Sequence, residues 1–147
     1  MFEIVEAGKG FYLASRASIP ERSAQWRHLR DEKGWNIIST WIDEAGAGET
    51  ACFGELWSRI KGEISGASCL LLYVEPDDFP LKGALVEVGL AMGEGIPIYV
   101  AAPGITLEGL TMRPLGSWVI HPTVTVFQSL DDALEAAAKH PGVRKVI

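Results

Sequence analysis

The sequence contains little cysteine and no long apolar run, and each absence excludes a class of protein. Cys52 and Cys69 are the only cysteines among 147 residues, which is too few for the disulfide framework of a small secreted domain. No apolar stretch approaches the ~20 residues that a membrane-spanning helix needs. His28, His121 and His140 are scattered along the chain, and no cysteine or histidine spacing resembles that of a zinc site. We therefore expect a cytoplasmic protein that uses no metal.

Basic residues are also in the minority. Thirteen Lys and Arg side chains stand against nineteen Asp and Glu, giving a net charge of −6 with neutral histidine. This balance argues against a general binder of nucleic acid or of anionic membranes, because both need a positive field. Hydrophobic residues are abundant at 48%, which excludes a disordered chain. The length suits one domain over residues 1–147.

Short apolar segments alternate with helical patterns along the chain. Strands are expected at residues 10–14, 36–40, 69–74, 96–101 and 124–127, and helices at 20–33, 53–66, 82–93 and 130–140. The uninterrupted apolar segment 69–74 is typical of a strand that is buried on both faces of a parallel sheet. This alternation predicts an α/β fold. We expect a flavodoxin-like three-layer sandwich, with a five-stranded, mainly parallel sheet of order 2-1-3-4-5 and helices on both faces.

Ligands of such sheets bind beyond the carboxyl ends of the strands, at the point where the strand order reverses. Three loops are therefore expected at the site: residues 15–19, 41–49 and 75–82. Their side chains include hydroxyls, cations, carboxylates and aromatic rings. The candidates from these loops, and from the strand that precedes the first of them, are Tyr12, Ser15, Arg16, Trp41, Asp77, Asp78 and Lys82.

Glu87 lies in the helix expected after the third loop, among apolar residues and glycines. A carboxylate in such a run is costly unless it faces a cleft. The alternative is that Glu87 points to solvent from the outer face of the helix. Gly83 and Gly89 weaken this helix by roughly 1 kcal/mol each relative to alanine. Because glycines at such positions usually permit the close approach of a ligand or of another backbone, they favour the cleft.

Gly83, Glu87, Gly89 and Ala91 form the pattern Gly-x-x-x-Glu-x-Gly-x-Ala, and a turn with a glycine and a proline follows it. This block, the acidic loop before it, the opening segment 11–15 and the segment 121–129 resemble the nucleoside 2-deoxyribosyltransferase-like family. That family includes nucleoside 5′-monophosphate N-glycosidases. The resemblance extends over about residues 10–140 of the chain.

The resemblance implies that Glu87 is a nucleophile that attacks the anomeric carbon of a sugar while the base departs, which gives a glycosyl-enzyme. Water or a second base then attacks from the opposite side, with net retention. Asp77 and Asp78 are candidate acids for protonating the base, although a Pro-Asp-Asp turn with solvated charges is an equal alternative. The implied activity is transfer or hydrolysis that exchanges or cleaves the base–sugar bond of a nucleoside or nucleotide, without a metal or an organic cofactor. A non-catalytic sensor of a nucleotide or of an NAD-derived metabolite is the second hypothesis.

The remaining candidates for substrate binding are Tyr12, Ser15, Arg16, Trp41, Lys82 and Gly83. Arg16 and Lys82 either bind a 5′-phosphate, with Lys82 at the start of a helix, or are solvated surface cations. Tyr12 and Trp41 either stack on a base or belong to the core.

Three positions depart from the family pattern: Ile60, Ser68 and Leu81 stand where relatives usually carry an acidic residue or, at the last position, a phosphate-binding serine. Hydrolysis, a changed substrate and lost catalysis all stay open on this evidence. The resemblance also implies a homo-oligomer, a dimer or larger, and the apolar, glycine-rich segment 105–119 suits that contact.

Overall fold

A computed structural model describes residues 9–44 and 52–144 of the chain. Its strands are β1 (Tyr12–Ala14), β2 (Leu70–Tyr73), β3 (Ile98–Ala101) and β4 (Val124–Phe127). Its α-helices are α1 (Pro20–Asp31), α2 (Phe53–Ser65), α3 (Gly83–Glu94) and α4 (Leu130–Ala137). Three short 3-10 helices join them: η1 (Thr40–Asp43), η2 (Pro76–Asp78) and η3 (Ser117–Ile120). Most of the predicted loop 41–49 lies outside the described residues.

The described residues form one parallel sheet of four strands, in the order β1-β2-β3-β4. The predicted α/β fold with a parallel sheet is therefore confirmed. The predicted number of strands, five, and the predicted order, 2-1-3-4-5, are wrong for the part of the chain that the structure describes. The error lies in the segment 36–40, which is not a strand of this sheet.

Side chains explain why the segment 36–40 does not continue as a strand. It meets the chain next to β1 at a single parallel bridge, between Phe11 and Ile37. Beyond that bridge the backbone of Leu13 pairs with side chains instead. Its N–H donates to Ser39 Oγ at 3.1 Å, and its carbonyl accepts from the indole N–H of Trp41 at 2.7 Å. These two bonds satisfy the edge of β1, so the chain is free to turn into η1.

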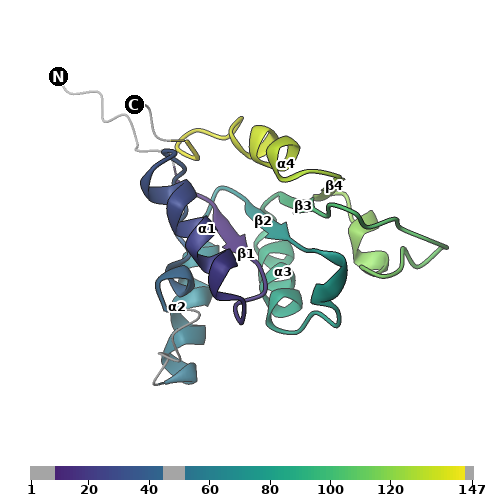
Figure 1. Cartoon of the computed structure of the whole chain (residues 1–147), viewed down its shortest axis with the longest axis horizontal. Coiled ribbons are helices and arrows are strands. Elements are labelled where there is room, and N and C mark those ends of the chain that lie inside the picture. Colours follow the sequence, from purple (N-terminus) through teal and green to yellow (C-terminus); the bar gives the residue numbers. More distant parts are fainter. Residues whose placement is uncertain (1–8, 45–51, 145–147) are drawn as a thin grey trace.

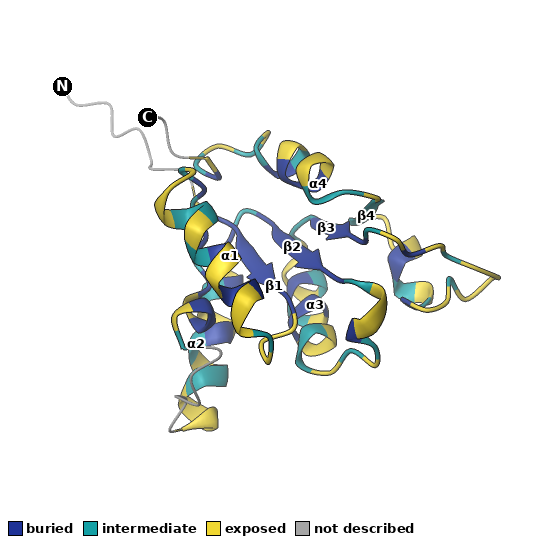
Figure 2. Ribbon diagram, in the orientation of Figure 1, coloured by how far each residue is buried: buried dark blue, intermediate teal, exposed yellow. Residues whose placement is uncertain are grey.

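Helices cover both faces of the sheet, with α3 on one side and α4 on the other (Figure 1). The strands β1 and β2 are buried throughout, whereas the outer faces of the helices are exposed (Figure 2). The interior of the sheet is therefore covered by two layers, as expected for apolar parallel strands. None of the helices in the described residues is long and apolar enough to cross a membrane.

The sequence predicts the positions of the helices better than it predicts which residues cap their N-termini. Ser129 caps α4 as its place before the helix predicts, and its Oγ accepts the Asp132 N–H at 3.1 Å. Ser18 and Glu21 have the spacing of a capping box, but none forms at α1, because Ile19 is the N-cap and no side chain caps it. The hydroxyl of Ser18 instead accepts from Arg16 Nε at 3.0 Å.

Candidate functional site

A cavity of about 450 Å³ lies where the loops after β1 and β2 meet the helices α2 and α3. A volume of this size is typical of small-molecule sites. Residues from the predicted loops 15–19 and 75–82 line it, and so does Trp41 from the start of the third predicted loop. Residues 45–51 lie outside the described part of the chain. The structure therefore places a cavity at the end of the sheet where the sequence predicts the site.

Glu87, in the second turn of α3, lines this cavity and is 8% exposed. Its Oε2 atom is buried and makes no well-aligned hydrogen bond to a described residue, although the Tyr12 hydroxyl lies close enough to act on the carboxyl as a donor. Burial is the main reason why the pKa of the Glu87 carboxyl is raised to about 7. The nearby Tyr12 hydroxyl opposes this shift, and the negative charge of Glu63 adds to it. The carboxyl therefore changes its charge near neutral pH.

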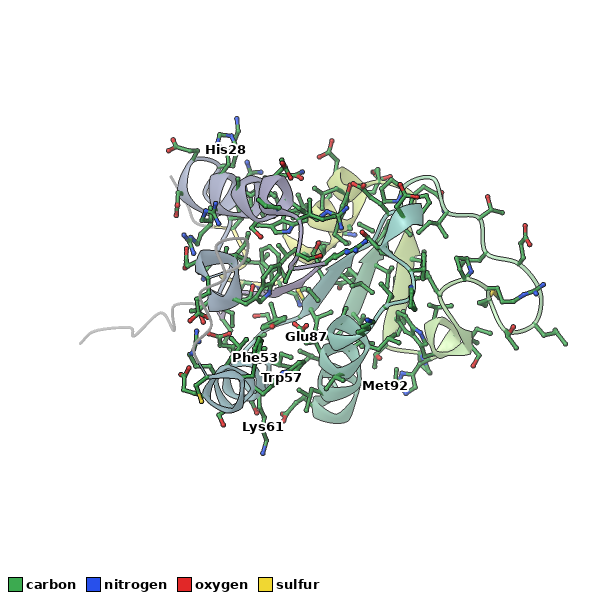
Figure 3. All side chains as sticks on the ribbon, turned by 60° about the horizontal axis from the view of Figure 1, so that its bottom comes forward. His28, Phe53, Trp57, Lys61, Glu87 and Met92 are labelled. Carbon is green, nitrogen blue, oxygen red and sulfur yellow. The ribbon has the colours of Figure 1, made fainter. Side chains whose placement is uncertain are left out.

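Trp57 of α2 and Glu87 of α3 approach one another at Gly83. Figure 3 shows Glu87 on the side of α3 that faces α2, where Phe53 and Trp57 project. A Cβ atom at Gly83 would lie 3.5 Å from the Trp57 ring and 3.9 Å from Glu87 Oε1. A side chain at position 83 would therefore contact both the ring and the carboxyl. A Cβ at Gly89, by contrast, meets nothing within 4 Å, so no described group approaches that second glycine closely.

The aromatic candidates Tyr12 and Trp41 are both buried beneath the site. Tyr12 is fully buried in β1 and does not line the cavity. Its burial, and then the neighbouring Glu87 carboxyl, raise the pKa of the Tyr12 hydroxyl, which makes no aligned hydrogen bond to any described group. Trp41 contributes to the cavity wall while its indole N–H is bonded to β1. Ser15 lines the cavity with a buried Oγ that also lacks a partner among the described residues.

The two candidate acids of η2 lie in different environments. Asp78 has a side chain that is 1% exposed, and its Oδ2 accepts from Arg22 at 2.6 Å and from the Glu75 N–H at 2.8 Å. Arg22 also contacts Glu75 Oε1 at 3.0 Å, and its guanidinium lies 5.3 Å from the centre of the Tyr73 ring. Asp77 is exposed and does not line the cavity. Asp78 is therefore held in a buried ion pair, and Asp77 faces away from the site.

The two candidate cations lie at the edge of the cavity. Arg16 and Lys82 are exposed and contribute to its lining. The guanidinium of Arg16 donates to the Asp77 carbonyl at 3.0 Å, so Arg16 joins the loop after β1 to the turn after β2. Lys82 is the residue that immediately precedes α3. Both cations are thus placed where they can meet an anionic group of a ligand at the cavity entrance.

Sequence reasoning missed the contribution of α2 to the site. Phe53, Leu56, Trp57 and Ile60 line the cavity, whereas their helical spacing predicts only a packing face. Phe53 differs from the others in being the first residue of the helix, which is visible in the sequence. In the structure its side chain is 68% exposed.

Sequence reasoning also missed Arg22, whose partners lie in the turn after β2. The signal for it was its spacing of four residues from the buried Trp26 on the same helix, because residues four apart share a helix face.

Other residue types add little to the site. Ile60 and Leu81, two of the positions that depart from the family pattern, both line the cavity with apolar side chains. Cys69 is buried, and its burial raises the pKa of the thiol to about 12, which agrees with a core position. In the part of the chain that the structure describes, no three His, Cys, Asp or Glu side chains gather in a group that could hold a metal ion.

Comparisons with known proteins find likeness at the level of structure. No protein-family model matches the chain, and no curated protein matches it in sequence. A 2-deoxyribosyltransferase from Leishmania mexicana superposes with a TM-score of 0.58 at 19% identity, covering 90% of this chain and 98% of that one. A CMP N-glycosidase from Clostridium botulinum superposes with a TM-score of 0.54 at 14% identity, covering 89% of this chain and 96% of that one. The resemblance that the Gly-x-x-x-Glu-x-Gly-x-Ala block indicates is thus confirmed as a shared fold, that of the nucleoside 2-deoxyribosyltransferase-like proteins.

Proposed function

We propose that this chain is an N-glycosyl enzyme that cleaves or exchanges the base–sugar bond of a nucleoside or nucleotide, with Glu87 as its nucleophile. The observation that carries the proposal is the Glu87 carboxyl, which lines a cavity of about 450 Å³ and has a buried oxygen without a partner among the described residues. The fold shared with a deoxyribosyltransferase and a nucleotide N-glycosidase supports it.

In the proposed reaction the ionised Glu87 carboxylate attacks the anomeric carbon of the sugar. The carbon–nitrogen bond breaks, its electron pair leaves with the base, which takes up a proton from water when it is not already cationic, and an ester joins the sugar to Glu87. Water or a second base then attacks the same carbon and releases the carboxylate, so the anomeric configuration is retained overall. Because the pKa of Glu87 is about 7, the reactive form becomes the major one above neutral pH.

We do not assign a proton donor to either candidate aspartate. Asp78 already accepts two hydrogen bonds, one from the buried Arg22 and one from a backbone N–H, and its side chain is almost inaccessible. Asp77 lies on the exposed side of η2. Glu87 alone therefore carries the proposed chemistry among the described carboxyl groups.

The cavity wall suggests how a nucleoside would bind. Trp57 and Trp41 provide flat apolar surfaces of the kind on which a base stacks. Arg16 and Lys82 lie at the entrance, where a 5′-phosphate would meet positive charge. Trp57 is close to Gly83 and so to Glu87, so we propose it as the principal base-binding surface.

The direct test is to incubate the protein with a panel of nucleosides, 2′-deoxynucleosides and 5′-monophosphates, and to measure free base by chromatography. Glu87→Gln keeps the shape of the side chain but removes the nucleophile, so we expect base release to stop. Glu135→Gln on the exposed face of α4 is the matched control and should release base at the wild-type rate. Equal release by wild type and Glu87→Gln would refute the proposal.

A second candidate function is a non-catalytic sensor of a nucleotide or nucleotide-derived metabolite. It is favoured by the apolar side chains of Ile60 and Leu81 in the cavity wall, because apolar groups bind a ligand without supplying acid or base. A sensor would show a ligand-dependent rise in Tm in both wild type and Glu87→Gln, with no base released by either.

Self-association into a dimer or a larger homo-oligomer stays a prediction. Leu110, within the segment 105–119, is 94% exposed, and Ile120 just beyond that segment is also exposed. Such apolar side chains suit a contact with a second copy of the chain. Size-exclusion chromatography with light scattering tests this, and a mass of 15.9 kDa would show a monomer.

A further inference from the structure

The Glu87 carboxyl in the cavity forms no ion pair with a described cation. The Glu87 carboxyl has an unpartnered oxygen there, and the charge of Glu63 acts on the same carboxyl. Glu63 is itself fixed by Thr40, whose hydroxyl donates to it at 2.6 Å. The cations of the lining, Arg16 and Lys82, are exposed at the entrance. A ligand that reaches Glu87 therefore enters a region that favours positive charge.

Aromatic rings are part of the same cavity lining. Trp41, Phe53, Trp57, Tyr73 and Phe79 all contribute to the lining. The face of an aromatic ring attracts cations, and tryptophan does so most strongly. Trp57 and the Glu87 carboxyl both lie close to Gly83. A flat cation in this place would contact a tryptophan ring and a carboxylate together.

The described lining also offers no carboxylic acid to protonate a departing base. Its carboxyl groups are Asp78 and Glu87. Asp78 Oδ2 is bound to the buried Arg22 at 2.6 Å, and the side chain is 1% exposed, although its Oδ1 has no partner among the described residues. Glu87 is the proposed nucleophile. A neutral base that departs with the bonding electron pair needs a proton. A cationic base departs as a neutral molecule and needs none.

From these three observations we infer that the substrate is an N-glycoside whose base is a cationic heteroaromatic ring, such as a pyridinium or an N7-alkylated purine. This inference rests on the proposed function, since it specifies the substrate class of the same site. The carbon–nitrogen bond breaks, its electron pair neutralises the positive ring nitrogen, and the anomeric carbon bonds to Glu87 Oε. Water then displaces Glu87, and its extra proton passes to solvent, so charge and atoms balance without an acid for the base.

Matched pairs of substrates test the inference. 7-Methylguanosine is compared with guanosine, and nicotinamide riboside with its neutral dihydro form, each also as the 5′-monophosphate, with free base measured by chromatography. Cationic glycosides hydrolyse faster spontaneously, so kcat/KM is divided by the uncatalysed rate constant. We expect this enhancement to be at least about tenfold larger for the cationic member of each pair, the factor that one cation–aromatic contact supplies.

The outcomes separate the inference from the proposed function. Base release from neutral nucleosides with an equal or larger enhancement would overturn the inference and leave the proposed function intact. No release from any member of either panel would overturn both. Release confined to the cationic members, and lost in Glu87→Gln, would support both.

A binding measurement tests the same inference without turnover. Isothermal titration calorimetry at pH 8 compares the cation 1-methylnicotinamide with neutral nicotinamide, which has almost the same shape. We expect the cation to bind wild type at least about tenfold more tightly and this preference to be smaller in Glu87→Gln, which removes the carboxylate charge but keeps the aromatic rings. Trp57→Leu should reduce the preference, and Trp57→Phe should reduce it less. Equal affinities of wild type for the two compounds would contradict the inference.

Discussion

The Glu87 carboxyl should make the fold less stable as the pH rises, and the neutral substitution Glu87→Gln should remove this dependence. Its pKa is raised from 4.5 to about 7 by burial. A raised carboxyl pKa means that the folded chain binds the proton more tightly than the unfolded chain. Its contribution is therefore fully present below pH 4.5 and is lost as the pH rises through about 7. At about 1.4 kcal/mol per pKa unit, the loss amounts to roughly 3 kcal/mol.

Glu87→Gln should match the protonated wild type in shape and charge, and it should not lose this stability at high pH. Between pH 5 and pH 8 the free energy of unfolding of the variant should therefore rise relative to wild type by about 2–3 kcal/mol. Urea unfolding followed by tryptophan fluorescence at several pH values measures this difference. The other carboxyl groups titrate alike in both proteins, so their effects cancel.

Glu135→Gln is the control, because Glu135 is exposed on α4 and its substitution should shift stability by the same small amount at every pH. If the difference between Glu87→Gln and wild type is the same at pH 5 and pH 8, the carboxyl titrates normally. The reasoning from its burial would then be refuted, and with it the argument that the group is held unpaired in the cavity.

Three further expectations concern the same region. Arg22→Met should destabilise the fold by about 3–5 kcal/mol in urea unfolding, because it leaves Asp78 buried without its partner. The control Arg30→Met removes a more exposed ion pair and should cost about 1 kcal/mol or less. Equal losses of stability in the two variants would contradict this prediction. Trp41→Phe should cost at least about 1–3 kcal/mol, since a buried carbonyl of β1 loses its donor; an unchanged unfolding midpoint would show that the bond contributes nothing. If the protein releases base, kcat/KM should rise with pH and level off above about 7, because Glu87 acts in its ionised form, and a profile that falls over this range would exclude it as the nucleophile.

The sequence predicts the parallel sheet well because its strands are short, apolar and separated by helical patterns. The segment 70–73 is buried throughout, as its unbroken apolar character indicates. The segment 36–40, Asn-Ile-Ile-Ser-Thr, is also predicted as a strand but is not one, because Ser39 and Trp41 bond the edge of β1 with side chains. A pattern of apolar residues does not reveal which polar atoms will satisfy a strand edge, so this error could not be avoided from periodicity.

The site was predictable in part for a similar reason. Glu87 could be found because a carboxylate stands out in an apolar helix. Phe53, Trp57 and Ile64 lie on one apolar face of α2. The helical spacing is the same along this face, but its N-terminal and C-terminal parts have different surroundings. Ile64 is fully buried, whereas the aromatic residues of the first turns line the cavity. Helical spacing identifies the inward face of a helix but does not say whether that face meets other side chains or an open cavity.

The two buried carboxyl groups of the cavity show how the fold separates a structural charge from one available to a ligand. Asp78 is neutralised by Arg22 at 2.6 Å, so its charge is compensated within the protein. Glu87 has no such partner among the described residues, and its ionisation costs roughly 3 kcal/mol of stability above neutral pH. A cation bound beside Glu87 would recover part of that cost. The stabilisation given by 1-methylnicotinamide should therefore be larger at pH 8 than at pH 5, because only the ionised carboxyl attracts it.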